Sequence, residues 1–129
     1  MKYEGFEQLP VWQASMQLGV RIHALTGKPD FRRQRSLGDQ IERAVVSISN
    51  NIAEGFERGT NQELLTFLNF SRGSAGEVRS MLCLLERLPA FRDLESEILN
   101  LKSEVKAFPD NSASGFARPR IPSCGASAM

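Results

Sequence analysis

The sequence predicts an all-α protein: an antiparallel up-down four-helix bundle over residues 1–108, followed by a disordered tail over residues 109–129. Apolar residues recur every three or four positions in four successive segments, which is the spacing of amphipathic helices. Short connections join these segments, and short connections place consecutive helices side by side and antiparallel. The final stretch is rich in Ser, Gly, Ala and Pro and has no periodicity, so it is predicted to be disordered.

The first predicted helix begins at Leu9-Pro10, because proline suits the first turn of a helix, and ends at Gly27-Lys28-Pro29. A loop over residues 30–35 follows. Ser36 is the predicted N-cap of the second helix, and Asp39 favours the positive end of its dipole. The expected core-facing residues are Val11, Ser15, Leu18, Ile22 and Leu25 in the first helix, and Leu37, Ile41, Val45, Ile48 and Ile52 in the second.

The third predicted helix begins with Thr60-Asn61-Gln62-Glu63, which has the form of a capping box. It continues to about Leu88, and Pro89 stops it. The fourth predicted helix spans about residues 92–107. The apolar arc of the third helix comprises Leu64, Phe67, Leu68, Phe70, Ala75, Val78, Met81, Leu82 and Leu85.

The second helix carries a polar stretch that is unusual for a helix interior, residues 47–51. Ser and Asn are poor helix formers because their side chains compete for backbone hydrogen bonds. A polar stripe beside an apolar face most often bonds to a neighbouring helix. We therefore interpret one set of residues as a structural interhelical network: Ser47, Asn51, Glu54, Ser74 and Glu77.

Catalysis is the alternative interpretation of the two carboxylates, Glu54 and Glu77, since a carboxylate pair can work as acid and base. The structural interpretation is favoured because buried polar groups are usually satisfied by neighbours. A di-iron centre would need Glu-x-x-His motifs, and His23 has no glutamate three positions before it. Cys83 has no histidine nearby in the sequence. We therefore expect no catalytic site, metal, cofactor or small-molecule substrate.

Several motifs together resemble one small bacterial family, the four-helix-bundle proteins of 23S ribosomal RNA intervening sequences. This family includes the accessory variability determinant of diversity-generating retroelements. The similarity covers about residues 6–88. It is carried by Gln40-Ile41-Glu42-Arg43-Ala44-Val45-Val46-Ser47-Ile48, Asn51-Ile52-Ala53-Glu54-Gly55, Gly73-Ser74 and Glu77, with Phe6, Leu9, Val11, Trp12, Leu25 and Thr26 in the opening segment.

The resemblance implies a four-helix bundle assembled as a homo-pentamer, and it implies no catalytic residue. The retroelement branch implies RNA and a reverse transcriptase as partners. A second apolar strip on the predicted helices also favours self-association, because one bundle core cannot cover it together with the main face. The interface candidates are Val46, Ala53 and Leu65.

The charge balance argues against strong nonspecific nucleic-acid binding. The chain has 16 basic and 15 acidic residues, for a net charge of +1. Without the predicted tail the two numbers are equal, and nonspecific binding depends on net neutralisation of phosphates. A neutral net charge does not exclude a local basic cluster, and the candidate residues for one are Arg32, Arg33, Arg35 and Arg43.

These observations predict a noncatalytic, oligomeric helical-bundle adaptor that contacts RNA or a nucleic-acid enzyme such as a reverse transcriptase. The alternative is a protein-binding scaffold with no role in nucleic-acid binding. The sequence has no run of 18 apolar residues, no signal-peptide pattern and only two cysteines, Cys83 and Cys124. We therefore expect a cytoplasmic protein that does not enter membranes.

Overall fold

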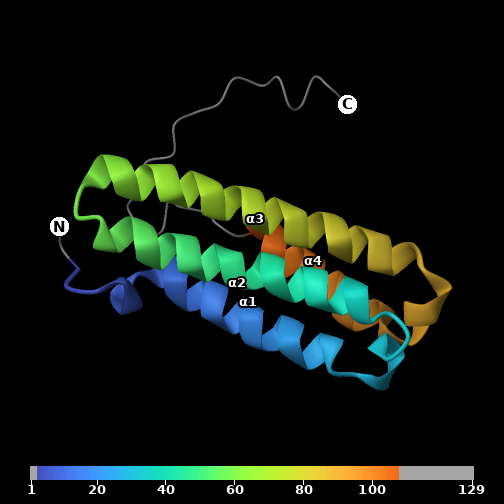
Figure 1. The fold of residues 1–129 in the computed structure, drawn as a ribbon. Coiled ribbons are helices and arrows are strands. Elements are labelled where there is room, and N and C mark those ends of the chain that lie inside the picture. The colour runs from blue at the N-terminus through green and yellow to red at the C-terminus, as the bar shows by residue number, and fades with distance from the viewer. Residues whose placement is uncertain (1–2, 108–129) are drawn as a thin grey trace.

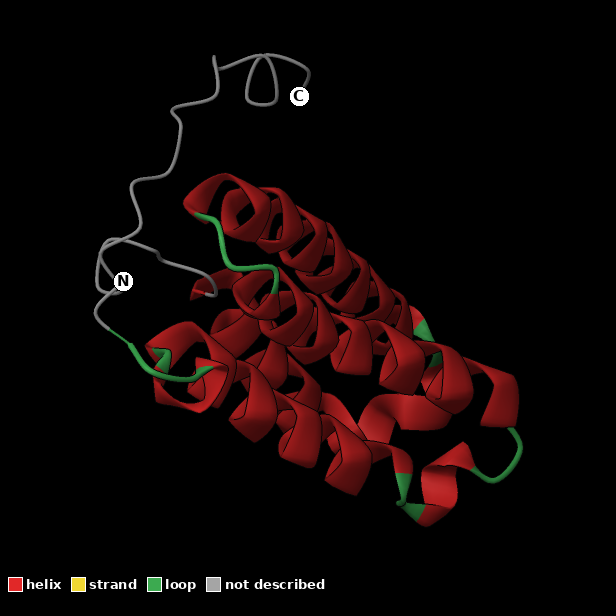
Figure 2. Ribbon diagram, turned by 60° about the vertical axis from the view of Figure 1, so that its left-hand side comes forward, coloured by secondary structure: helices red, strands yellow, loops and turns green. Residues whose placement is uncertain are grey.

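Four long helices make up most of the described chain. The computed structural model describes residues 3–107, and Figure 1 shows α1 (Pro10–Thr26), α2 (Arg35–Glu57), α3 (Asn61–Arg87) and α4 (Glu95–Ala107). Three short 3-10 helices, η1 (Phe6–Gln8), η2 (Pro29–Phe31) and η3 (Pro89–Leu94), precede α1, α2 and α4. No strand occurs in this part of the chain (Figure 2), so the predicted all-α, four-helix class is confirmed. The predicted tail over residues 109–129 lies outside the described residues.

The helices pack into one bundle around a continuous apolar core. The α1–α2 and α3–α4 connections lie at one end of the bundle and the α2–α3 turn at the other (Figure 1). α2 and α3 make the most extensive helix contact, and α1 contacts both α2 and α4. The largest fully buried side chains are Leu9, Leu18, Ile22, Leu25, Ile41, Ile48, Ile52, Leu64, Leu82, Leu85, Phe91 and Ile98.

Most helix ends follow the sequence signals. Pro10 occupies the first turn of α1. The hydroxyl of Thr60 accepts a hydrogen bond from the Glu63 amide at 3.1 Å and so caps α3, as the capping-box pattern predicts. α3 ends at Arg87, directly before Leu88 and Pro89. Each of these ends is set by local chemistry, which explains why the sequence predicts it.

Two predicted helix starts are wrong by a few residues. α2 begins at Arg35, with Gln34 as a cap residue that makes no side-chain cap hydrogen bond, so Ser36 lies inside the helix. α4 begins at Glu95 instead of near residue 92, because the 3-10 helix η3 comes first. In η3 the side chains of Phe91 and Leu94 are buried in the core. Burial of these two side chains stabilises the fold more than the additional helical hydrogen bonds of a longer α4 would.

Small residues bring α2 and α3 close together. Gly55 of α2 is buried, and a Cβ atom at this position would lie 2.6 Å from Cβ of Phe67 and 3.3 Å from Cα of Leu64. The fully buried Ser71 donates a hydrogen bond of 2.8 Å from Oγ to the carbonyl oxygen of Ile48. Gly55 therefore allows the α3 backbone to approach α2 closely.

We predict opposite effects of alanine at two helical glycines. Gly55→Ala should lower the free energy of unfolding by about 1–3 kcal/mol, because the added methyl overlaps Phe67. Gly73→Ala should raise it by up to about 1 kcal/mol, since no atom lies within 4 Å of the added Cβ and alanine is the better helix former. Urea unfolding followed by circular dichroism measures both. A stabilising Gly55→Ala substitution would contradict the close contact.

Candidate nucleic-acid interface

The predicted polar network is centred on two serines that face each other across the α2–α3 contact. The Ser47 and Ser74 hydroxyl oxygens lie 2.9 Å apart, and either can donate. Asn51 Nδ2 donates to the carbonyl oxygen of Ser47 at 2.8 Å and to its hydroxyl at 3.1 Å. These three half-buried side chains therefore form one linked cluster, with two members on α2 and one on α3.

The two carboxylates of the predicted network lie outside this cluster. Glu54 is exposed and forms an ion pair of 3.0 Å with Arg58, one turn further along α2. Arg58 in turn lies over the ring of Phe67, 5.0 Å from its centroid. Glu77 is exposed, and its side chain makes no hydrogen bond or ion pair among residues 3–107. The structure thus joins Ser47, Asn51 and Ser74 and separates the two glutamates from them.

The α1–α2 connection holds the predicted basic cluster in place. Its backbone turns through η2, and the Phe31 side chain is buried in the core against Phe91, with ring centroids 4.5 Å apart. Gly38 of α2 contacts Phe31 and Thr26, so the start of α2 lies close against the connection. This anchoring leaves Arg32, Arg33 and Arg35 exposed around a fixed turn.

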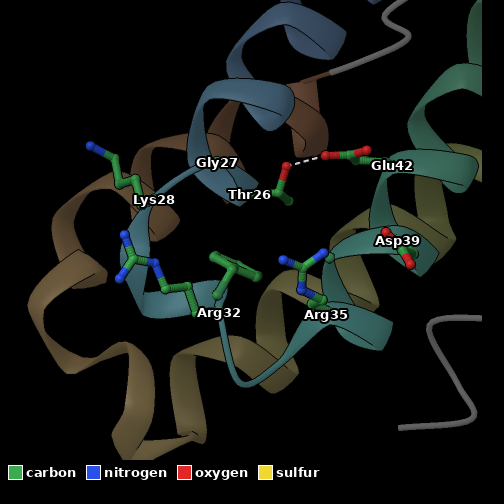
Figure 3. A pocket seen from close by; sticks show the side chains of 9 residues that line it. Thr26, Gly27, Lys28, Arg32, Arg35, Asp39 and Glu42 are labelled. Carbon is green, nitrogen blue, oxygen red and sulfur yellow. Dashed lines mark hydrogen bonds between the residues drawn. The ribbon is translucent and has the colours of Figure 1, made fainter.

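A hollow of about 320 Å³ opens at this connection. It is lined by Thr26, Gly27, Lys28, Phe31, Arg32, Arg35, Gly38, Asp39 and Glu42. Figure 3 shows Lys28 and Arg32 on one side, Asp39 and Glu42 on the other, and Arg35 between them. Two of the three predicted loop arginines therefore border one concave site, whereas Arg33 is not among its lining residues.

The charged side chains around the hollow differ in their partners. Lys28 Nζ lies 3.5 Å from Oε2 of Glu97, on α4. Glu42 accepts a hydrogen bond from the Thr26 hydroxyl, and its Oε2 lies 3.6 Å from Nδ1 of His23. Arg32 and Arg35 form no ion pair within residues 3–107. The arginines are thus the groups at this site that remain available to an anion.

The acidic side of the hollow was missed by the sequence interpretation. Arg35, Asp39 and Glu42 are spaced by four and three residues, so they share one face of α2. That spacing was the signal that could have revealed the mixed charge of the site. Arg43, the fourth predicted nucleic-acid residue, does not line the hollow but borders an adjoining depression of α2, which shares Asp39 and Glu42 with it.

The predicted interface residues lie on α2 and α3. Val46 is 53% exposed and Ala53 is half-buried, both on α2. Leu65 is exposed on α3. It lies eighteen residues, or five full turns, before Cys83, so the two residues share one face of α3. Cys83 lies close to Lys102 of α4. Phe70 was predicted in the core arc of α3, which is wrong, because its side chain is 52% exposed.

Lys102 forms an ion pair with Glu86 close to Cys83. Its Nζ donates to Oε1 of Glu86 at 2.6 Å, and this hydrogen bond raises the pKa of the Lys102 ammonium, with a smaller contribution from Cys83. Both charged groups are partly exposed, and the pair links α3 to α4. Within residues 3–107, no three His, Cys, Asp or Glu side chains are grouped as metal ligands would be.

The sequence pattern of residues 7–108 matches the family model described as 23S rRNA-intervening sequence protein. The chain belongs to this family. The match covers all four helices. It includes α4, which lies beyond the motif resemblance over about residues 6–88. A comparison with curated proteins finds no match. None of the helices between residues 3 and 107 has the length and apolar character needed to traverse a bilayer.

The serine pair allows a direct test of the polar cluster. In a double-mutant cycle with Ser47→Ala and Ser74→Ala, we expect a coupling free energy of about 0.5–1.5 kcal/mol, because the two hydroxyls bond to each other. Thermal or urea unfolding of the four proteins gives this value. Combining Ser47→Ala with Ser103→Ala, an exposed position on α4, is the control and should give additive effects. Additivity in the Ser47/Ser74 cycle would contradict the network.

Proposed function

We propose that this protein is a noncatalytic, homo-oligomeric adaptor that contacts nucleic acid through the α1–α2 connection. RNA, alone or held by a nucleic-acid enzyme such as a reverse transcriptase, is the proposed partner in the cytoplasm. The observation that carries this proposal is the placement of Arg32 and Arg35 at a concave, fixed turn without carboxylate partners among the described residues. The family description, which refers to ribosomal RNA intervening sequences, is consistent with it.

The proposed contact is to phosphate groups. Guanidinium groups bind phosphate oxygens through two parallel hydrogen bonds, and Arg33 adds a third exposed cation beside the hollow. Phe31, the aromatic residue of the connection, is buried, so no ring at this site is free to stack on a base. Contacts to phosphates position a protein on nucleic acid but carry no sequence information. The binding should therefore be nonspecific.

Asp39 and Glu42 limit the affinity of a single subunit, because two carboxylates lie on the opposite side of the same hollow. The near-neutral net charge of +1 adds little attraction at long range. Repetition of the site in a cyclic assembly would compensate, since several weak contacts to one RNA molecule combine into a stronger one. Assembly is therefore an essential part of the proposed function.

Exposed apolar side chains support the proposed self-association. Val46 is more than half exposed, and Ala53 and Leu65 are only partly covered by the bundle. In a ring of identical subunits, each copy would bury the exposed apolar side chains of its neighbour. We propose a pentamer, a number that comes from the family resemblance and not from the apolar surface itself.

RNA binding should be strongly salt-dependent and should depend on the loop arginines. For the triple variant Arg32/Arg33/Arg35→Ala, the slope of log affinity against log salt should be shallower by about 2–3 than for wild type, because fewer phosphates are neutralised. Fluorescence anisotropy with a structured RNA at several salt concentrations measures this.

A matched variant separates a local site from general charge. Arg72/Arg79/Lys106→Ala removes the same charge from positions on α3 and α4, outside the α1–α2 connection. It should bind RNA nearly as well as wild type. Equal weakening in both variants would remove the α1–α2 connection from the proposal, and absence of binding by wild type would favour a protein-binding scaffold.

The oligomer is tested by light scattering at micromolar concentration, where the mass should be several times the chain mass of 14.4 kDa. Val46→Asp should lower this mass, because a carboxylate would be buried in the interface without a partner. Val20→Asp makes the same chemical change at the most exposed apolar residue, on α1, and should leave the mass unchanged. A monomeric wild type would refute the proposed assembly.

The protein-binding scaffold is the second candidate function. Its specific support is the exposure of two large apolar side chains on α3, Phe70 and Leu84, neither of which lines the proposed RNA site.

A further inference from the structure

α3 presents a seam with the spacing of a coiled coil. Six residues of α3 and the residue directly after the helix follow each other at alternating intervals of three and four residues. In a coiled coil, positions with this spacing contact the partner helix. They are Phe67, Phe70, Ser74, Glu77, Met81, Leu84 and Leu88. The sequence interpretation assigned most of these residues to the core or to the polar network.

One half of this seam is already used inside the bundle. Phe67 packs against Gly55 and under Arg58, and Ser74 bonds to Ser47. Met81 and Leu88 are half-buried against the core. Phe67 and Ser74 contact α2, so this part of the seam borders the α2–α3 contact.

The other half of the seam faces solvent. Phe70 is 52% exposed, Leu84 is 44% exposed, and Glu77 between them is also exposed. They are separated by seven residues each, so the two apolar side chains lie about 21 Å apart on one side of the helix with the carboxylate midway. Among the exposed large apolar residues described, Phe70 and Leu84 are the one pair with fourteen-residue spacing. Scattered apolar residues would not have this register.

Glu77 determines what can cover the seam. A helix packed over Phe70 and Leu84 would remove water from the carboxylate, which has no ion pair among residues 3–107. A buried charge without a partner is costly, so the covering helix needs a cation opposite Glu77. Apolar residues on either side of that cation would then meet Phe70 and Leu84.

A symmetric pairing of α3 with the α3 of a second copy does not fit this requirement. In an antiparallel pairing of two α3 helices, Phe70 would meet the Leu84 of the other copy, but each Glu77 would face the other Glu77. Facing carboxylates repel, which disfavours that pairing. The other exposed large apolar residues, at positions 16, 20, 46, 65 and 99, contain no pair fourteen residues apart that could flank a cation.

We propose that the Phe70–Glu77–Leu84 seam docks an amphipathic helix of a different protein, with Lys or Arg midway between two apolar residues spaced seven positions from it. The complex is a helix packed lengthwise on α3, held by two apolar contacts and one charge pair. None of the three seam residues lines the α1–α2 hollow, so this interaction does not depend on the proposed RNA binding.

The test uses two labelled synthetic peptides, each about 25 residues long, with leucines at coiled-coil spacing over about 37 Å. They differ only at the central seam position, which is Lys in one peptide and Glu in the other. In fluorescence anisotropy, wild type should bind the Lys peptide about tenfold or more tightly than the Glu peptide, because the Glu peptide places like charges together. Glu77→Lys should reverse this preference. A reversal distinguishes a specific charge pair from general apolar adhesion.

Further variants define the apolar contacts. Phe70→Ala and Leu84→Ala should each weaken binding of the Lys peptide, whereas Val20→Ala, an exposed change on α1, should not. Circular dichroism confirms that each variant keeps its helix content. The proposal is overturned if neither peptide binds wild type, or if Glu77→Lys leaves the preference unchanged. It is also overturned if the Phe70→Asp variant has a lower oligomer mass than wild type in light scattering, because this result would show that a second copy covers the seam.

Discussion

The close contact between α2 and α3 is the constraint on which the other surfaces of this protein depend. Gly55 leaves no room for a methyl group against Phe67, and Ser71 reaches the backbone of Ile48. Larger side chains at these positions would force the helices apart, because packed interiors tolerate little added volume. The pair of hydroxyls at Ser47 and Ser74 then bonds directly without a bridging group.

This close pairing determines which side chains are left outside the bundle. Ser71 faces α2, and Phe70, one residue earlier, is turned about 100° away from it and is exposed. Val46 is turned about 200° from the buried Ile48 on α2 and is exposed for the same reason.

The proposed interaction sites have no residue in common and use different physical interactions. At the α1–α2 connection, exposed arginines border a hollow that also contains carboxylates, so attraction to phosphate is local and sensitive to salt. Along α3, apolar side chains flank one carboxylate, so the attraction comes mainly from burial of apolar area and the charge selects the partner. An adaptor requires separate surfaces of this kind, because both partners must bind at the same time.

The sequence by itself determined the class of the fold, the number of helices and most of their ends. Periodicity of apolar residues, Pro10, Thr60 with Glu63, and Pro89 act through local geometry, so no knowledge of tertiary contacts is needed. It also predicted one network containing Ser47 and Ser74, since both positions border apolar faces, and in the structure their hydroxyls lie 2.9 Å apart. Only the tertiary structure decided that Glu54 pairs with Arg58, that Glu77 and Phe70 face solvent, and that Asp39 and Glu42 lie opposite the arginines. A helical wheel gives the direction of a side chain, but the distance and rotation of neighbouring helices decide whether that direction leads into the core or into water.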